Sequence, residues 1–431
     1  MHDTNSTIKK KIPCFGFILH LHPRKVNPSV LRFHLTFGLG GMAALLVAVQ
    51  AVTGLLLKFH YVPTPQGAYN SILNLQETLL FGKMLRSIHH WGAILLIWVV
   101  FLHLLRVVFT GAYRKPRHSN WHIGLLLFIL VVFSNFTGYL LPWDQLSYWA
   151  ITISTNLIGF IPFGGSWLKE VLLGGTEVGR ATLTKFYNLH TGIIPFSMLI
   201  LMAYHFWHVR KAGGVVVAEE FKYLDNIDTN PHLVAREFVV ALVLLAVLFF
   251  LGSVFDAPLR DRANPAMSPD PAKAPWYFMG LQELLIHFHP FIVVVFFPLV
   301  LLFAALGLPY FIKKDKLYGI WFISSNGKKA AVYAMFFGIL ITLFFILADE
   351  FLPGPEIVAP NLPTWITSGV LPLTVSLIAV YSFLRYLKKK YLLNRAGIVQ
   401  TFIVFLVAAY SILTITGIFF RGKGMSLVWP W

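Results

Sequence analysis

Nine long apolar segments divide this chain of 431 residues between polar loops. A helix of about 20 such residues spans a bilayer, where every backbone polar group must be satisfied within the chain. Charged residues make up 12% of the chain, against about 25% in soluble domains. We therefore expect an all-α polytopic membrane protein. Its expected spans are 33–58, 88–110, 122–141, 190–209, 237–255, 291–312, 331–348, 370–387 and 398–420.

Basic residues mark every second loop. Cytoplasmic loops carry an excess of Lys and Arg, so this pattern predicts a cytoplasmic N-terminus and an outer C-terminus. The pI near 9.8 then reflects topology and contact with acidic lipid rather than a nucleic-acid partner. The basic segments are the N-terminus, 111–121, 210–236, 313–329 and 385–395, whereas loop 349–369 has no Lys or Arg.

The charged stretch 211–236 is the expected domain boundary. It separates residues 1–220, with an amphipathic N-terminal segment and a four-helix bundle, from the C-terminal helices of 221–431. Two outer loops, 142–189 and 256–290, are long and rich in Pro, Gly and Trp. Long ordered loops usually cover a functional site.

Four histidines lie in two expected spans: His89 and His103 in the second, and His190 and His205 in the fourth. The spacings of 14 and 15 residues correspond to roughly 21 to 23 Å along a helix. Both spans run from outside to inside, so the depths of the two pairs match. The pattern favours two metal macrocycles stacked across the membrane, each between two imidazoles. It indicates transmembrane electron transfer.

His208 competes with His205 because it lies a whole number of turns from His190. It would lie about 27 Å from His190, a mismatch near 6 Å with the facing pair, whereas His205 mismatches by only about 1.5 Å. The depth comparison therefore favours His205.

Two glycine pairs repeat the spacing of the first histidine pair: Gly40 with Gly54, and Gly124 with Gly138. Glycine lets a flat macrocycle approach a helix closely. Ordinary small-residue helix packing is the alternative for any one of them.

Two arginines flank the histidines of the second span. Arg86 precedes His89 by one turn, and Arg106 follows His103 by three residues. Each could pair with a heme propionate at the membrane edge. A snorkelling anchor at the interface is the alternative.

Five further stretches combine with these residues: R-S-I-H-H-W (86–91), T-G-Y-L-L-P-W-D-Q-L-S-Y-W-A (137–150), T-L-T-K-F-Y-N-L-H-T (182–191), A-N-P (263–265) and A-P-W-Y-F (274–278). With them the chain resembles the cytochrome b subunit of cytochrome bc and bf complexes. The gap between His190 and His205 is similar to that of the bf branch, since the mitochondrial type has a gap that is shorter by one. The domain that the bf branch encodes as a separate subunit is here part of the same chain.

The resemblance implies two non-covalent hemes b, with low potential at His89/His190 outside and high potential at His103/His205 inside. It also implies a Q cycle: quinol oxidation at the outer site, one electron to a Rieske protein, the other to quinone inside, and a proton gradient. The implied partners are the Rieske protein, a c-type cytochrome, lipid and a second copy of the complex. The implied location is the bacterial cytoplasmic membrane.

The outer quinol site of this family often reads Pro-Glu-Trp-Tyr, whose glutamate is held to accept a quinol proton. Here Pro275 stands at that carboxylate's position, before Trp276 and Tyr277. A proton acceptor is still needed, and Glu283 is our hypothesis for it, with Tyr277 as a second catalytic residue. A plain loop or salt-bridge position for Glu283 is the alternative. The Pro-Trp-Tyr form favours menaquinone over ubiquinone.

Other quinone residues are expected on both sides. Trp143 and Tyr148 would help wall the outer site, unless they only pack the loop. The resemblance points to Arg210 and Asp225 for the inner site, unless both are cytoplasmic surface charges.

Two departures from the family concern added groups. The bf branch attaches an extra heme to a cysteine in the first span, but Gly38 occupies that position. The single cysteine, Cys14, excludes a disulfide within the chain and is expected to be structural or incidental. The ninth span exceeds the eight of the mitochondrial type, and we expect it to contact another subunit or lipid.

Two other classes compete with this interpretation. One is another membrane cytochrome with paired histidines, such as a dehydrogenase anchor, which would have fewer spans and no A-P-W-Y loop. The other is a transporter whose buried histidines relay protons. The transporter would show no visible absorbance.

Overall fold

The computed structural model describes residues 22–312, 318–322, 324–354 and 360–429. Within these ranges nine helices are long and apolar enough to cross a membrane, which confirms the all-α polytopic prediction. Cys14 and the expected amphipathic N-terminal segment lie outside the described residues. The spanning elements are α3 (Leu39–Lys58), α5 (Gly82–Phe109), α6 (His118–Tyr139), α9 (Arg180–Asn188) continued by η2 (Leu189–Ile193) and α10 (Ile194–Lys211), α11 (Thr229–Val254), η5 (Ile292–Phe296) with α13 (Phe297–Phe311), α14 (Ser325–Phe351), η6 (Trp365–Val370) with α16 (Leu371–Tyr391), and α17 (Arg395–Phe419).

Several helices extend beyond the apolar runs that predicted them. The seventh span begins at Ser325 rather than at 331, because the Ser324 side chain accepts a hydrogen bond from the backbone N–H of Gly327 at 3.0 Å. Such a cap starts a helix in polar sequence, before the hydrocarbon region is reached. Hydropathy therefore marks the buried length of a span and not its full length.

The first expected span, 33–58, is two helices rather than one. A short α2 (Phe33–Thr36) ends at Phe37, and α3 begins after Gly38; both intervening residues have positive φ, 50° and 67°. A left-handed backbone conformation is incompatible with a continuing helix. A Cβ atom added at Gly38 would also lie 3.0 Å from Val240 Cγ1. Both features disfavour a heme-bearing cysteine at this position.

Short elements occupy the loops. At one end, β1 (Lys25–Val26) pairs antiparallel with β2 (Ile227–Asp228). The other short helices are α4 (Ala68–Thr78), α7 (Gln145–Ile158), α8 (Gly165–Leu173), α12 (Met279–His287), and the 3-10 turns η1 (Pro28–Leu31), η3 (Glu219–Phe221), η4 (Trp276–Phe278) and η7 (Lys423–Met425).

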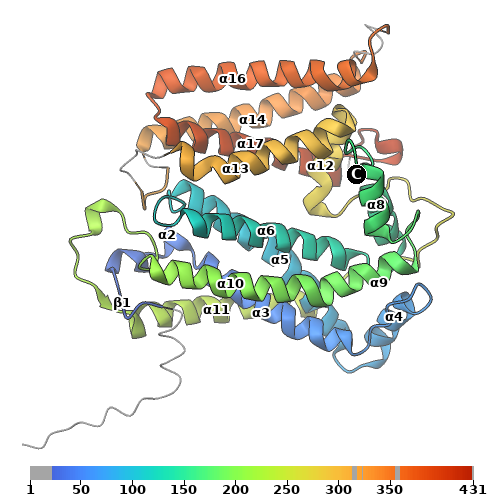
Figure 1. Ribbon diagram of the computed structural model, residues 1–431, viewed down its shortest axis with the longest axis horizontal. Coiled ribbons are helices and arrows are strands. Elements are labelled where there is room, and N and C mark those ends of the chain that lie inside the picture. Colours follow the sequence, from blue (N-terminus) through green and yellow to red (C-terminus); the bar gives the residue numbers. More distant parts are fainter. Residues whose placement is uncertain (1–21, 313–317, 323, 355–359, 430–431) are drawn as a thin grey trace, which may run out of the picture.

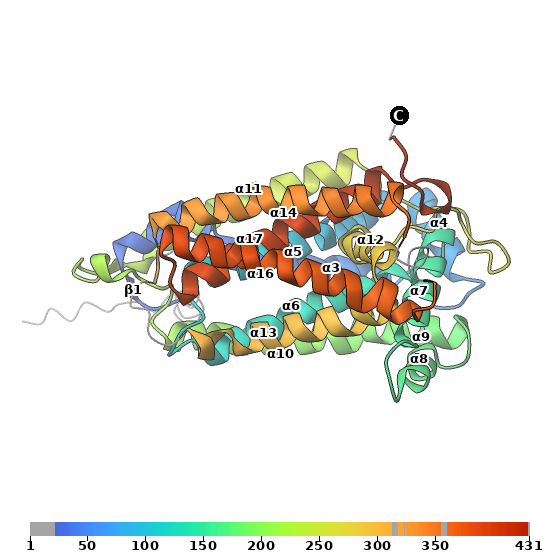
Figure 2. The ribbon, with the colours of Figure 1, turned by 90° about the horizontal axis from the view of Figure 1, so that it is seen from above.

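The long helices run side by side, as Figure 1 shows. In that view α13, α14, α16 and α17 lie on one side, and α3, α5, α6, α10 and α11 on the other. Figure 2, turned by 90°, shows α4, α7, α8 and α9 gathered at one end of the bundle and β1 at the other. The two long expected outer loops, which hold α7, α8 and α12, are thus on the same side.

The main hydrophobic core joins the first five spans. It includes Leu46 of α3, Leu96 of α5, Val131 of α6, Met198 of α10 and Leu248 of α11, all at most 6% exposed. Because α11 contributes to it, this core continues across the expected boundary between residues 220 and 221. The division into two domains stays a prediction.

Candidate functional site

His89 of α5 and His190 of η2 face each other across the bundle. Their ring centroids are 6.2 Å apart and their planes differ by 81°. Two nitrogens bound to opposite sides of one metal ion lie about 4 Å apart, since each bond is about 2 Å. The ring centres then lie about 6 Å apart, so the observed separation suits a heme iron between the two rings.

Hydrogen bonds orient both rings of this outer pair. The Thr53 hydroxyl donates to the carbonyl of Val49 at 2.7 Å, so its oxygen accepts from Nδ1 of His89 at 2.9 Å. Nδ1 of His190 donates to the carbonyl of Ser134, also at 2.9 Å. With the proton on Nδ1, the Nε2 lone pair of each ring is available to a metal.

A single π-helical turn, η2, contains His190. In it the N–H of Ile194 donates to the carbonyl of Leu189, five residues back. A π-turn holds one residue more than an α-turn, and such turns are frequent at functional sites. The longer spacing from His190 to His205 thus covers the same depth as the spacing from His89 to His103, which lie in the continuous helix α5.

The two expected outer glycines lie directly against the two outer histidines. A Cβ atom added at Gly54 would be 3.1 Å from Cε1 of His89, and one added at Gly138 would be 2.5 Å from Cε1 of His190. Each ring therefore occupies space that is free only because the neighbouring helix has a glycine at this position. The glycine that lets two helices approach closely is also the residue that the imidazole contacts.

The inner pair repeats this arrangement. A Cβ atom at Gly40 would lie 3.4 Å from Cε1 of His103, and one at Gly124 would lie 3.5 Å from Cε1 of His205. His208 instead packs against the ring of Tyr204, with centroids 4.6 Å apart. This contact pattern supports the choice of His205 over His208.

Alanine at Gly138 should disrupt the outer pair. The added Cβ would overlap the His190 ring, which the Ser134 carbonyl holds in place. We expect Gly138→Ala to have a lower heme-to-protein ratio than the unchanged chain. Pyridine hemochrome absorbance measures this ratio. Gly41→Ala, where an added Cβ meets nothing within 4 Å, is the control; equal heme content in both variants would contradict the prediction.

The two expected arginines differ in what they bind. Arg86 is buried and donates to the carbonyls of Ala257 and Pro258 at 2.8 and 2.6 Å. Arg106 donates Nε to the carbonyl of Leu35 at 3.1 Å, and its buried Nη2 has no partner within the described part of the chain. Nη2 of Arg106 is therefore available to bind an anion. Arg86 instead holds the loop after α11 through its two hydrogen bonds to that loop.

Two predicted outer quinol residues, Trp276 and Tyr277, lie in η4 directly before α12, and Pro275 is the N-cap of that turn. Trp276 stacks on Trp98, with centroids 5.0 Å apart and an angle of 11°. Its Nε1 and the hydroxyl of Tyr277 are buried and have no hydrogen-bond partner among the described residues. Burial raises the pKa of Tyr277, so this hydroxyl remains a donor. Two adjacent unsatisfied donors are costly unless a ligand accepts from them.

Trp143 and Tyr148 lie in a separate core beneath the outer loops, 6% and 7% exposed. Their rings meet edge to face at 5.5 Å. The backbone N–H of Ala263 donates to the carbonyl of Trp143 at 3.1 Å, which ties the two outer loops together. These contacts suit the loop-packing alternative.

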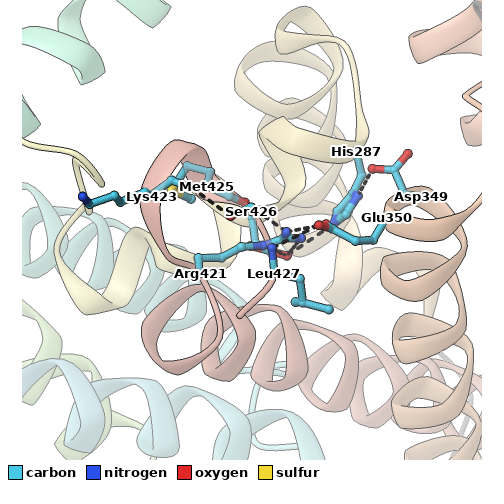
Figure 3. Close-up of polar contacts among 9 residues, drawn as sticks. His287, Asp349, Glu350, Arg421, Lys423, Met425, Ser426 and Leu427 are labelled. Atoms are coloured by element: carbon cyan, nitrogen blue, oxygen red, sulfur yellow. Dashed lines mark hydrogen bonds and ion pairs between the residues drawn. The ribbon is translucent and has the colours of Figure 1, made fainter. Parts of the chain in front are cut away.

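Glu283 is fully buried in α12 and forms an ion pair with Arg421, at 2.7 Å between Oε1 and Nη2. It is also 3.3 Å from Nε2 of His287, whose Nδ1 is 2.7 Å from Asp349 (Figure 3). Arg421 reaches Glu350 as well, at 2.8 Å. The salt-bridge alternative for Glu283 is therefore present in the structure. Sequence reasoning missed the other four members of this network: His287, Asp349, Glu350 and Arg421.

The ninth span packs within this chain. Tyr410 of α17 lies against Gly280 and donates its hydroxyl to the carbonyl of Tyr277 at 2.8 Å. Lys273 donates to the carbonyl of Ile418 at 2.8 Å. We expected this span to contact another subunit or lipid. The structure shows in addition that one face of α17 packs inside the chain and supports the outer loop.

On the opposite side, Arg210 and Asp225 are both exposed. A cavity of about 680 Å³ lies at this end, lined by basic residues that include Arg114, Arg117 and Lys222, but by neither predicted quinone residue. The basic loop 111–121 is the sequence signal for this cavity: its charges predict the cytoplasmic side, and several of them also line the cavity.

Four histidine rings inside a bundle of membrane-spanning helices each lie against a glycine, and the rings of His89 and His190 face each other, an arrangement typical of a membrane cytochrome. Residues 24–213 match the family described as Cytochrome b/b6/petB. A cytochrome b6 of Prochlorococcus marinus (strain MIT 9515) is 39% identical over 188 residues, which cover 44% of this chain and 85% of that protein. A cytochrome b6 of Heliomicrobium gestii is 43% identical over 177 residues, which cover 41% of this chain and 83% of that protein.

The fold is similar to that of a chain in the solved structure of a hyperthermophilic respiratory Complex III. The TM-score is 0.67 at 22% sequence identity, over 95% of this chain and 96% of that one. The chain belongs to the cytochrome b/b6 family and is a cytochrome b subunit of the bc/b6f type.

Proposed function

We propose that the chain is the diheme cytochrome b of a quinol oxidase complex that works by a Q cycle. Quinol would be oxidised at the outer site, giving one electron to a Rieske protein and one to quinone at the inner site. The observation that carries the proposal is the set of four histidines, each facing one glycine at the expected spacing. The hemes would supply the path for electrons between the two sides.

Different residues of this chain would hold the outer and the inner heme. His89 and His190 would bind the outer, low-potential heme, and His103 and His205 the inner one. Thr53 fixes the tautomer of His89. Nη2 of Arg106, which no described residue contacts by a hydrogen bond, would suit an inner propionate.

At the outer site, the hydroxyl of Tyr277 and Nε1 of Trp276, neither with a partner among the described residues, would orient the quinol oxygen. Pro275 favours menaquinol as the substrate. A Rieske protein, a c-type cytochrome and a second copy of the complex would complete turnover in a bacterial cytoplasmic membrane, with the N-terminus inside. Arg210 and Asp225 remain our proposed residues for the inner quinone.

A dithionite-reduced spectrum of the purified chain tests the central claim. Two b-type components of different potential are expected, whereas a histidine-relay transporter would show no visible absorbance. Quinol-dependent reduction that outer-site quinol analogues inhibit would separate this cytochrome from other membrane cytochromes with paired histidines.

Glu283→Gln tests the proposed proton acceptor. We expect quinol oxidation to fall by about 100-fold, because general-base assistance contributes at least that much, while both b-type components remain. Stopped-flow reduction by quinol measures the rate. The matched control is Glu177→Gln, on an outer loop; a fully active Glu283→Gln complex would refute the role.

A further inference from the structure

His287 ends α12 and bridges two carboxylates. Its Nε2 lies 3.3 Å from Oε1 of Glu283, one turn back in the same helix, and its Nδ1 lies 2.7 Å from Oδ2 of Asp349 at the end of α14. Figure 3 shows the imidazole pointing from α12 toward Asp349. Each ring nitrogen thus has its own carboxylate.

Exposure increases along these three side chains. The side chain of Glu283 is 0% exposed, that of His287 is 9% exposed, and that of Asp349 is 40% exposed. The series therefore connects the buried interior of α12 with the surface, at the end of the bundle that also holds the η4 loop. A neutral imidazole accepts a proton on one nitrogen and donates from the other, as such a connection requires.

We propose that Glu283, His287 and Asp349 form the exit route by which a quinol proton leaves the outer site. This inference rests on the proposed function. The Glu283 carboxyl gives its proton to Nε2 of His287, and Nδ1 passes its own proton to Asp349, which releases it to water. No electron moves: the O–H bond of Glu283 and the Nδ1–H bond break as the Nε2–H bond and the O–H bond of Asp349 form. The ring is then left with its proton on Nε2, and it returns to the starting tautomer when Nε2 releases that proton to water and Nδ1 regains one.

The surrounding charges favour the first transfer, from Glu283 to His287. Burial raises the pKa of Glu283, but hydrogen bonds from His287 and Arg421 outweigh it and leave that pKa below its ordinary value. Burial lowers the pKa of His287, but hydrogen bonds to Asp349 and Glu283 outweigh it and leave that pKa above its ordinary value. A proton therefore favours His287 over Glu283.

Arg421 is not part of the proton route, but it lowers the pKa of Glu283. Its Nε and Nη2 both donate to Glu283, at 3.1 and 2.7 Å, and its Nη1 donates to Glu350 at 2.8 Å. Lys273, in the loop before η4, donates to the carbonyl of Ile418. The guanidinium keeps Glu283 ionised between turnovers, so that it is ready to receive the next proton.

The first test is His287→Ala in the intact complex. We expect both b-type components to persist, quinol oxidation to fall by about 100-fold, and added imidazole to restore a large part of the rate. His289→Ala, two residues further on, should keep full activity. A purely structural role for His287 would not respond to imidazole. An unchanged rate in His287→Ala, or a loss that imidazole does not relieve, would overturn the proposal.

The second test, Asp349→Asn, changes an exposed residue and does not depend on the fold of α12. We expect slower quinol oxidation, by about 10-fold, and a larger solvent hydrogen isotope effect than in the wild type. An unchanged rate and isotope effect would exclude Asp349 from the route. If the wild-type complex itself does not oxidise quinol, the proposed function fails, which is a distinct result.

Discussion

His205→Leu should remove the inner b-type component while the outer component persists. Leucine fills the volume of the ring but cannot bind iron, so His103 would lack the second histidine that should hold the inner heme. We expect the heme content to fall from about two toward about one per chain. Redox titration of the reduced absorbance band measures which component disappears.

His208→Leu is the matched control, since it lies one turn further along the same helix. This ring packs between Tyr204 and Trp207, with centroids 4.6 and 5.0 Å from its own, rather than against Gly124. Both b-type components should survive. If His208→Leu loses the inner component and His205→Leu keeps it, our assignment of the inner pair is wrong.

Arg421→Met should destabilise the chain strongly. The substitution leaves the carboxylate of Glu283 fully buried without its main partner. Breaking one side of a buried ion pair costs about 3–5 kcal/mol. The midpoint of thermal unfolding, followed by circular dichroism of the purified complex, should fall accordingly.

The double variant Glu283→Gln with Arg421→Met should recover much of this loss, because no buried charge is left unpaired. Lys423→Met, an exposed position two residues further on, is the control and should leave the midpoint unchanged. An unaltered midpoint in Arg421→Met would mean that the ion pair contributes nothing to stability.

Sequence reasoning reached the spans and the four histidines because both depend on regular helix geometry. The length of an apolar run fixes a span, and the spacing of two histidines within it fixes their depths and their helix face. The contacts of Gly40, Gly54, Gly124 and Gly138 followed from the same repeat.

The partners of Glu283 could not be found in this way. Arg421 and Asp349 both lie far along the chain from α12, one after the end of α17 and the other at the end of α14, so tertiary packing alone brings them together. The break at Phe37 and Gly38 was also missed, since an apolar sequence conceals a change of backbone conformation. The ninth span was found as a helix, but its position against α12 was not.

The π-turn at Leu189–Ile193 has a consequence for how this family can vary in length. One residue inserted into a regular helix rotates everything beyond it by about 100°, which would carry a distant ligand to the wrong face. Here one widened turn takes up the extra residue beside the first histidine. An insertion or deletion at that turn can therefore change the count between two histidines and leave both in place.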